Sequence, residues 1–219
     1  MRAVRRIREA LLGYRIVYRR DVSDNRVALT FDDGPSEWTP PILDVLAEHD
    51  AHATFFLLGE HVNRAPAVAA RIVRDGHEVA CHSFDHVDLA ELPAVAIREQ
   101  LSSARAAIAT ATGVEPRLFR PPYATASPRV ARAAAKLSLG PTILRDVDPA
   151  DWRADDAEAV AALVLADTRP GSIVCLHDGV PLGNRGTPER AVTVQAVARL
   201  VPELCSRGFD LVTVSDLLA

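Results

Sequence analysis

The sequence of 219 residues predicts a single-domain α/β fold in which helices cover a parallel sheet. Short β-like runs alternate along the chain with longer segments of helical periodicity, and there are seven such runs. No linker, low-complexity stretch or internal repeat interrupts this alternation. A barrel-like (β/α) arrangement fits seven strands in one domain, and an open doubly wound sheet is the alternative.

The predicted strands are short apolar runs, and they occupy residues 26–31, 53–58, 77–81, 117–120, 142–147, 172–176 and 210–214. The predicted helices lie between them, at residues 41–49, 65–74, 93–112, 128–137, 156–167 and 188–207. Proline and glycine mark several boundaries. Pro93 begins the longest helix and Gly113 follows its end, while Gly76, Gly140 and Gly208 follow three other helices.

Composition excludes several classes of protein. Hydrophobic residues make up 48% and charged residues 25% of the chain, with three cysteines, which excludes disordered, collagen-like and disulfide-rich chains. The longest apolar run, residues 159–166, is far shorter than the ~20 residues of a membrane-spanning helix. We therefore expect a soluble globular protein.

Charge divides the chain into a basic arm, residues 1–25, and a domain, residues 26–219. Residues 1–20 carry seven arginines and Glu9, a net charge of +6, so the remainder carries −10 of the total of −4. Such an arm can make weak contact with an anionic membrane surface. An amphipathic helix that packs on the domain is the favoured alternative, and its apolar residues are Ile7, Leu11 and Leu12.

Basic residues other than Lys136 are all arginine, a compositional bias that does not indicate nucleic-acid binding. Because no apolar stretch of 7–15 residues follows the arginines, we expect no signal peptide and a cytoplasmic location. Cys81, Cys175 and Cys205 show no CxxC spacing and are expected to be buried free thiols. The sequence makes no prediction of the oligomeric state.

Titratable and aromatic residues gather directly after five of the first six predicted strands. They are Asp32, Asp33, His82, His86, Arg120, Tyr123, Asp148, Asp151, Trp152, His177 and Asp178. Because parallel strands end at the same edge of a βα fold, these residues are expected to converge on one site.

His82 and His86 are four residues apart, and with a nearby carboxylate they form a two-histidine, one-carboxylate set that can hold a divalent metal. Asp32 and Asp33 are adjacent, and adjacent strand residues face opposite ways, so one can bind the metal while the other acts as a base. A divalent metal lowers the pKa of water towards ~7, and a carboxylate can then take its proton. His177, at another strand end, is the expected general acid.

Five ordered motifs make this sequence similar to the polysaccharide deacetylase family, carbohydrate esterase family 4, which shares a homology domain with rhizobial chitooligosaccharide deacetylases (the NodB homology domain). The motifs are Thr30-Phe31-Asp32-Asp33-Gly34-Pro35, His82-Ser83-Phe84-Asp85-His86, Arg120-Pro121-Pro122-Tyr123, Asp148-Pro149-Ala150-Asp151-Trp152 and Leu176-His177. The resemblance spans about residues 26–215. It implies a distorted (β/α)₇ barrel and metal-dependent removal of acetyl groups from sugars.

The resemblance also implies a role for each motif residue. The metal, usually zinc and sometimes cobalt or another divalent ion, would be bound by Asp33, His82 and His86. Asp32 would be the general base, oriented by Arg120, and His177 the general acid, supported by Asp151. The backbone N–H of Tyr123 would help to stabilise the oxyanion. Trp152 and Leu176 would form an apolar pocket for the acetyl methyl group.

The sequence leaves the substrate open. The leading hypothesis is an N-deacetylase of chitooligosaccharide, peptidoglycan-type glycan or a small acyl-sugar. The alternatives are an O-acetyl esterase on a xylan-like glycan and a non-catalytic carbohydrate-binding relative. Two local features bear on the groove. Val87 stands where the family usually has proline, and the loop at residues 179–188 is expected to border the groove.

Overall fold

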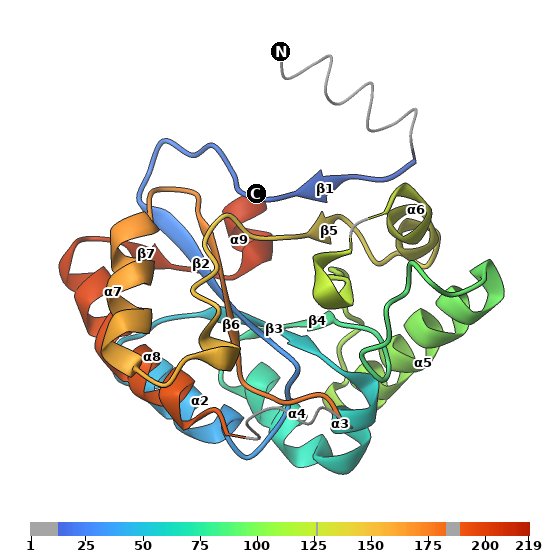
Figure 1. Ribbon diagram of the computed structural model, residues 1–219, viewed down its shortest axis with the longest axis horizontal. Helices are drawn as coiled ribbons and strands as arrows, with labels where there is room; N and C mark the ends of the chain where they lie inside the picture. The colour runs from blue at the N-terminus through green and yellow to red at the C-terminus, as the bar shows by residue number, and fades with distance from the viewer. Residues whose placement is uncertain (1–12, 126, 183–188) are drawn as a thin grey trace.

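The computed structural model describes residues 13–125, 127–182 and 189–219. Parallel strands form the inside of the molecule, and helices surround them (Figure 1). The central strands lie in the order β4–β3–β2–β6 and are, in that order, Glu78–Cys81, Ala53–Leu57, Arg26–Asp32 and Ile173–His177. Their register pairs Asp32 with His177, so these two side chains end neighbouring strands.

Single bridged residues close the sheet into a ring. Phe119 bridges Cys81 of β4 on one side and Thr142 on the other, and Val147 bridges Val174 of β6. The strands therefore surround a common interior, which confirms the predicted distorted barrel of one domain over the open doubly wound sheet.

Two predicted strands are shorter than expected. The strand predicted at residues 117–120 is reduced to one bridged residue, because Pro121 directly after it has no N–H to donate to a neighbour. The strand predicted at residues 142–147 forms only two paired residues. Its regular pairing is interrupted where the Asp146 carboxylate, instead of a backbone carbonyl, accepts the N–H of Ile173 at 2.8 Å.

The predicted basic arm, residues 1–25, contributes a strand of its own. β1 (Ile16–Val17) pairs in parallel with β5 (Thr142–Ile143), and the Val17 side chain is fully buried. The described part of the arm therefore packs on the barrel. Outside the described residues lies the helix predicted at the start of the arm, with its apolar residues Ile7, Leu11 and Leu12.

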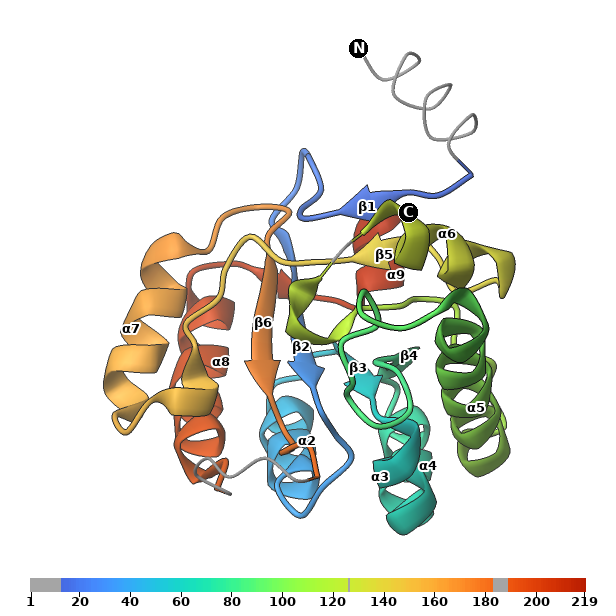
Figure 2. The same cartoon turned by 45° about the vertical axis from the view of Figure 1, so that its right-hand side comes forward.

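The C-terminal helix covers the end of the barrel where the strands begin. β7 (Asp210–Leu211) pairs with the start of β2, and Thr213 then caps α9 (Val214–Leu218), so the strand predicted at residues 210–214 ends early. The N–H of Val214 donates to Thr54 Oγ1 of β3 at 2.8 Å. In Figure 2 the arrowheads of β2 and β6 point away from α9, towards the opposite end of the barrel.

The predicted helices are confirmed within three residues at each described end. The long helices around the barrel are α2 (Thr39–Glu48), α4 (Pro66–Arg74), α5 (Ala94–Thr112), α6 (Pro128–Lys136), α7 (Ala157–Asp167) and α8 (Ala191–Ser206). The start predicted for α8, residue 188, lies outside the described residues. The unpredicted helices are short: α3 (Gly59–Arg64), η1 (Pro122–Ala124) and η2 (Asp151–Arg153).

Alternation along the strands separates two apolar clusters. In β2, Leu29 and Phe31 face the surrounding helices, whereas Ala28 faces the barrel interior. The interior cluster is completed by the other strands and by α9, through Leu217. Because side chains alternate with period two, the next interior positions of β2 are Thr30 and Asp32. The interior thus changes from apolar at the α9 end to polar at the other end.

The three cysteines are free thiols, as predicted, with Cys81 and Cys175 buried and Cys205 partly exposed. Among the described helices, none is both long and apolar enough to cross a membrane.

Replacement of Leu217 by alanine tests the closing role of α9. Leu217 is fully buried in the interior cluster, so we expect Leu217→Ala to lower the free energy of unfolding by about 2–4 kcal/mol. Leu163→Ala, at a helical position that is 40% exposed, is the matched control and should cost less than about 1 kcal/mol. Urea unfolding measures both variants. Equal losses of unfolding free energy in the two variants would contradict the role of Leu217 in closing the barrel.

Candidate active site

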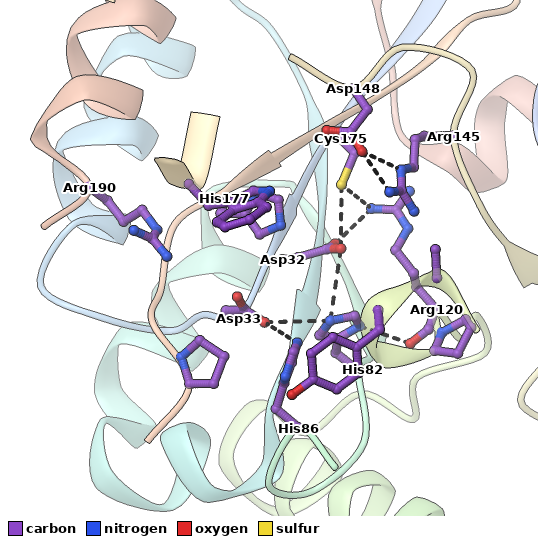
Figure 3. A pocket seen from close by; sticks show the side chains of 15 residues that line it. Asp32, Asp33, His82, His86, Arg120, Arg145, Asp148, Cys175, His177 and Arg190 are labelled. Atoms are coloured by element: carbon purple, nitrogen blue, oxygen red, sulfur yellow. Dashed lines mark hydrogen bonds and ion pairs between the residues drawn. The ribbon is translucent and has the colours of Figure 1, made fainter. Parts of the chain in front are cut away.

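A pocket of about 330 Å³ lies at the end of the barrel where the strands finish (Figure 3). It brings together most of the predicted site residues, namely Asp32, Asp33, His82, His86, Arg120, Tyr123, Trp152 and His177. Asp151 lies behind His177, and Leu176 does not line the pocket. The remaining lining residues are Pro121, Ala124, Arg145, Asp148, Cys175, Pro181 and Arg190.

The Arg120 guanidinium occupies the barrel interior beneath the pocket, where its side chain is only 1% exposed. Its Nη1 donates to Asp32 Oδ1 and to Thr30 Oγ1, both at 2.7 Å. Its Nε and Nη2 donate to the carbonyls of Ile143 and Leu144 at 3.3 and 3.1 Å. The guanidinium therefore bonds in several directions and fixes the orientation of the Asp32 carboxylate.

Asp32 is a buried carboxylate that stays ionised. Burial alone raises its pKa, but the positive charge of Arg120, together with His82 and His177 in their protonated forms, outweighs burial and lowers the pKa to about 2. Its second oxygen, Oδ2, accepts the thiol proton of Cys175 at 3.4 Å. The carboxylate is therefore available as a proton acceptor throughout the neutral range.

Asp33 and the two histidines form a compact group of ligand atoms. Asp33 Oδ1 lies 3.2 Å from His86 Nε2 and 3.5 Å from His82 Nε2. This oxygen is buried and has no hydrogen bond within the described residues. Burial raises the pKa of Asp33 to about 7, and a cation against Oδ1 would favour the ionised form. An unsatisfied carboxylate oxygen facing two imidazole nitrogens fits a divalent metal.

Both histidines are neutral and oriented as ligands. Burial lowers the pKa of His82 to about 4 and that of His86 to about 3, so each ring keeps a nitrogen lone pair. His82 donates Nδ1–H to the Arg120 carbonyl at 2.8 Å, which leaves Nε2 facing Asp33. Behind the group, His61 of α3 donates Nδ1–H to the Asp33 carbonyl at 2.6 Å.

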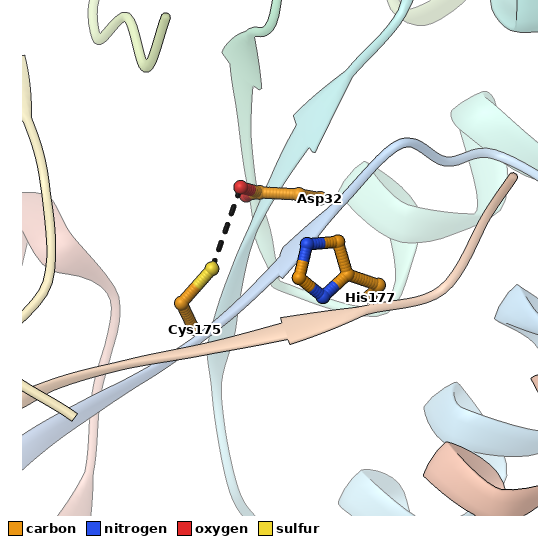
Figure 4. Close-up of side chains that lie close together, drawn as sticks. All are labelled: Asp32, Cys175 and His177. Carbon is orange, nitrogen blue, oxygen red and sulfur yellow. Dashed lines mark hydrogen bonds between the residues drawn. The ribbon is translucent and has the colours of Figure 1, made fainter. Parts of the chain in front are cut away.

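A second group of ligand atoms is less suited to a metal. Among the described residues, Asp32, Cys175 and His177 also have ligand atoms within 4.8 Å of one another (Figure 4). Asp32 is already paired with Arg120, however, and burial raises the pKa of the Cys175 thiol well above its ordinary value. His177 is protonated at neutral pH, as its pKa shows below. The group formed by Asp33, His82 and His86 is therefore the better suited of the two to hold a metal.

His177 is held by Asp151 as a charged acid. Its Nδ1 donates to Asp151 Oδ1 at 2.8 Å and its backbone N–H to Oδ2 at 2.9 Å, while Thr193 Oγ1 donates to Oδ2 at 2.6 Å. Burial lowers the pKa of His177, but the charge and hydrogen bond of Asp151 outweigh burial and raise the pKa to about 9. The protonated ring reaches the pocket across from the metal group.

Tyr123 offers its backbone rather than its ring. Its N–H finds no backbone acceptor within the described residues. Its φ of 56° lies in the left-handed region, as do the φ angles of Asp33 and His86 at 72° and 65°. Such angles cost of order 1–2 kcal/mol each in residues with a Cβ, so the surrounding contacts hold these three residues against strain. The Tyr123 ring packs edge-on against His86 at 4.7 Å between centroids.

One predicted site residue is placed elsewhere. Leu176, expected in the apolar pocket with Trp152, is fully buried in the outer cluster between the sheet and the helices. Its neighbours Cys175 and His177 point into the barrel, and adjacent strand residues face opposite ways. Cys175 therefore lines the pocket in place of Leu176.

Sequence reasoning also missed His61, Arg145 and Arg190 as parts of the site. His61 belongs to α3, a helix too short to show a periodicity, and no sequence signal indicated it. Period-two alternation from His177 back along β6 could have identified Cys175.

Metal-dependent hydrolysis needs a cation site, a base and an acid around one substrate, and this pocket provides all three. The names of similar proteins agree with this class. The chain is 41% identical over 198 residues to the chitooligosaccharide deacetylase of Bradyrhizobium sp. (strain ANU 289), which covers 87% of this chain and 90% of that protein. Residues 19–141 match the polysaccharide deacetylase family. The chain belongs to the polysaccharide deacetylase family and is a carbohydrate deacetylase.

Solved structures show the same fold. The peptidoglycan N-acetylglucosamine deacetylase Bc1960 superposes with a TM-score of 0.85 at 30% identity, covering 95% of each chain. BA3943 from Bacillus anthracis, a pseudoenzyme of carbohydrate esterase family 4, superposes with a TM-score of 0.83 at 29% identity, covering 93% of this chain and 69% of that one. The fold thus occurs with and without activity, and the residues in the pocket must distinguish the two.

The pH dependence of kcat/KM tests the His177–Asp151 pair. A general acid must be protonated, so activity should fall as pH rises through the His177 pKa of about 9. In Asp151→Asn the charge that raises this pKa is lost, and the alkaline limb should move to lower pH, towards the ordinary histidine value of ~6.5. Asp155→Asn, at an exposed position, is the control and should leave the limb in place. An unchanged limb in Asp151→Asn would contradict the assignment.

Proposed function

We propose that the protein hydrolyses the N-acetyl group of amino sugars, in chitooligosaccharides, peptidoglycan-type glycans or small acyl-sugars. The observation that carries this proposal is that Asp32 and His177 share one pocket, with Asp32 held ionised by Arg120 and His177 held protonated by Asp151. An amide needs both a base for the attacking water and an acid for the leaving amine.

The residues divide the reaction as follows. Asp32 Oδ2 takes a proton from water as the water oxygen bonds to the amide carbon. The Tyr123 N–H donates to the carbonyl oxygen as negative charge develops there. His177 gives its ring proton to the amide nitrogen as the C–N bond breaks, which releases acetate and the free amine. Asp33, His82 and His86 would hold a divalent ion, which would supply Lewis-acid activation of water and of the carbonyl.

Zinc is the metal we propose. Two imidazole nitrogens and one carboxylate oxygen form a ligand set that zinc accepts while keeping positions open for water and substrate, and cobalt accepts the same set. The neutral state of His82 and His86 supports this choice, because protonated rings could not bind a cation.

The names of the relatives support an amide over an ester as the target. One relative is named a chitooligosaccharide deacetylase and another a peptidoglycan N-acetylglucosamine deacetylase. An O-acetyl esterase on a xylan-like glycan is not favoured. The retained base, acid and metal ligands also argue against a purely carbohydrate-binding protein, which would need neither proton donor nor proton acceptor.

Acetate release from N-acetylglucosamine oligomers tests the proposal. Chelation should abolish release, and zinc or cobalt should restore it. Asp32→Asn should bind metal normally while turnover falls ~100-fold or more, because the amide cannot accept the proton. Asp24→Asn, on the surface and paired with Arg26, is the control and should retain turnover. No release by the metal-loaded protein would contradict the proposed function.

We also propose that the protein is cytoplasmic and that its basic arm makes weak contact with an anionic membrane surface. The support is the charge of residues 1–20, +6, beside a charge of −10 on the remaining 199 residues. Co-sedimentation with vesicles containing phosphatidylserine should decrease when residues 1–12, which precede β1, are deleted, and the difference between the two forms should disappear at high salt. Equal binding by both forms would contradict the proposal.

A further inference from the structure

The directions assigned around the scissile amide restrict where the acyl group can lie in the pocket, and this step rests on the proposed function. The carbonyl oxygen points to the Tyr123 N–H and the metal group, and the nitrogen points to His177. The rest of the lining includes Pro121, Ala124, Pro181 and Arg190, and a polar group that we assign to the acyl side: Cys175, Arg145 and Asp148, with Trp152. In Figure 3, Cys175, Arg145 and Asp148 lie together on the side of Asp32 opposite to Asp33 and His86.

This acyl wall is polar, although an acetyl group ends in a methyl. Arg145 donates Nε and Nη2 to Asp148 Oδ2 at 2.9 and 2.6 Å, and the two side chains are only 27% and 32% exposed. Cys175 lies at the bottom of the wall, where it is 2% exposed and its thiol donates to Asp32 Oδ2. A methyl group placed against an ion pair removes water from charged groups without replacing its hydrogen bonds.

The wall is also more open than the sequence predicts. Leu176 faces the outer core, so the side chain that reaches the pocket from β6 is the smaller thiol of Cys175. One more heavy atom on the acyl group can extend past the thiol towards Arg145 and Asp148. A hydroxyl in that place can accept from the Arg145 guanidinium and donate to the Asp148 carboxylate, so both of its hydrogen-bonding functions are used.

We propose that the acyl wall of Cys175, Arg145 and Asp148 lets the enzyme accept two kinds of amino sugar. The nitrogen carries an acetyl group in one kind and a hydroxyacyl group, such as hydroxyacetyl, in the other. The wall acts on specificity alone. The bond that breaks is the same amide, and the product acid is hydroxyacetate in place of acetate.

Three glucosamine oligomers that differ only in the N-acyl group test the proposal: N-acetyl, N-hydroxyacetyl and N-propionyl. Hydroxyacetyl and propionyl have the same number of heavy atoms, so their comparison separates polarity from size. We expect kcat/KM for hydroxyacetyl to equal or exceed that for acetyl and to exceed that for propionyl ~10-fold or more. The ratio is modest because water can still reach the partly exposed Arg145 and Asp148.

Two variants assign this preference to named residues. Arg145→Met keeps the length of the side chain without its donors, and should bring hydroxyacetyl and propionyl within about threefold of each other. Cys175→Leu fills space in the acyl wall, and should lower the rate on hydroxyacetyl about tenfold more than the rate on acetyl. Arg199→Met on α8 is the matched control and should keep all ratios, because within the described residues the guanidinium donates to the Gln195 carbonyl of the same helix and not to the pocket.

The outcomes separate this inference from the proposed function. Release of acetyl with propionyl equal to or better than hydroxyacetyl would overturn the hydroxyacyl wall and leave the deacetylase intact. An unchanged ratio in Arg145→Met would overturn the role of Arg145. Failure to release any of the three acyl groups with metal bound would contradict the proposed function itself.

Discussion

A guanidinium inside the barrel organises the whole site. The guanidinium of Arg120 lies in the barrel interior, 4.1 Å from the centre of the Phe56 ring. It donates to the side chains of Thr30 and Asp32 and to the backbone carbonyls of Ile143 and Leu144. The backbone carbonyl of Arg120 orients His82. Removing one partner of a buried ion pair typically costs about 3–5 kcal/mol, because the other charge is left unpaired. The base, one metal ligand and the centre of the barrel therefore depend on the same residue.

The adjacent carboxylates of Asp32 and Asp33 show how position separates two functions. Asp32 faces inward to Arg120, which holds its pKa at about 2, while Asp33 turns out of the strand at a φ of 72° and has a buried oxygen without a hydrogen bond. A charged partner keeps one carboxylate permanently ionised. The other faces two neutral histidines, so a bound cation would complete its contacts. Because the two adjacent residues face different sides of the strand end, each carboxylate meets a different set of partners.

The sequence predicts most of this arrangement, because polar residues at strand ends and ordered motifs are local patterns. The barrel, the helices and the convergence of Asp32, His82 and His177 follow from them. The failures arise where tertiary contacts decide. Asp146 interrupts a strand through its side chain, and Thr213 starts a helix where apolar residues predict a strand. The motif resemblance places Leu176 in the pocket, whereas strand alternation turns it to the outer core. His61 contacts the Asp33 carbonyl from a short helix that has no signal in the sequence.

The central claim is that the metal is bound by Asp33, His82 and His86, with Asp32 left free as the base. Anomalous diffraction at the zinc absorption edge, on crystals of the zinc-loaded protein, tests this most directly. We predict a single strong peak between Asp33 Oδ1 and the Nε2 atoms of the two histidines. A peak among Asp32, Cys175 and His177 instead would contradict the account, because the base and the acid would then both be metal ligands.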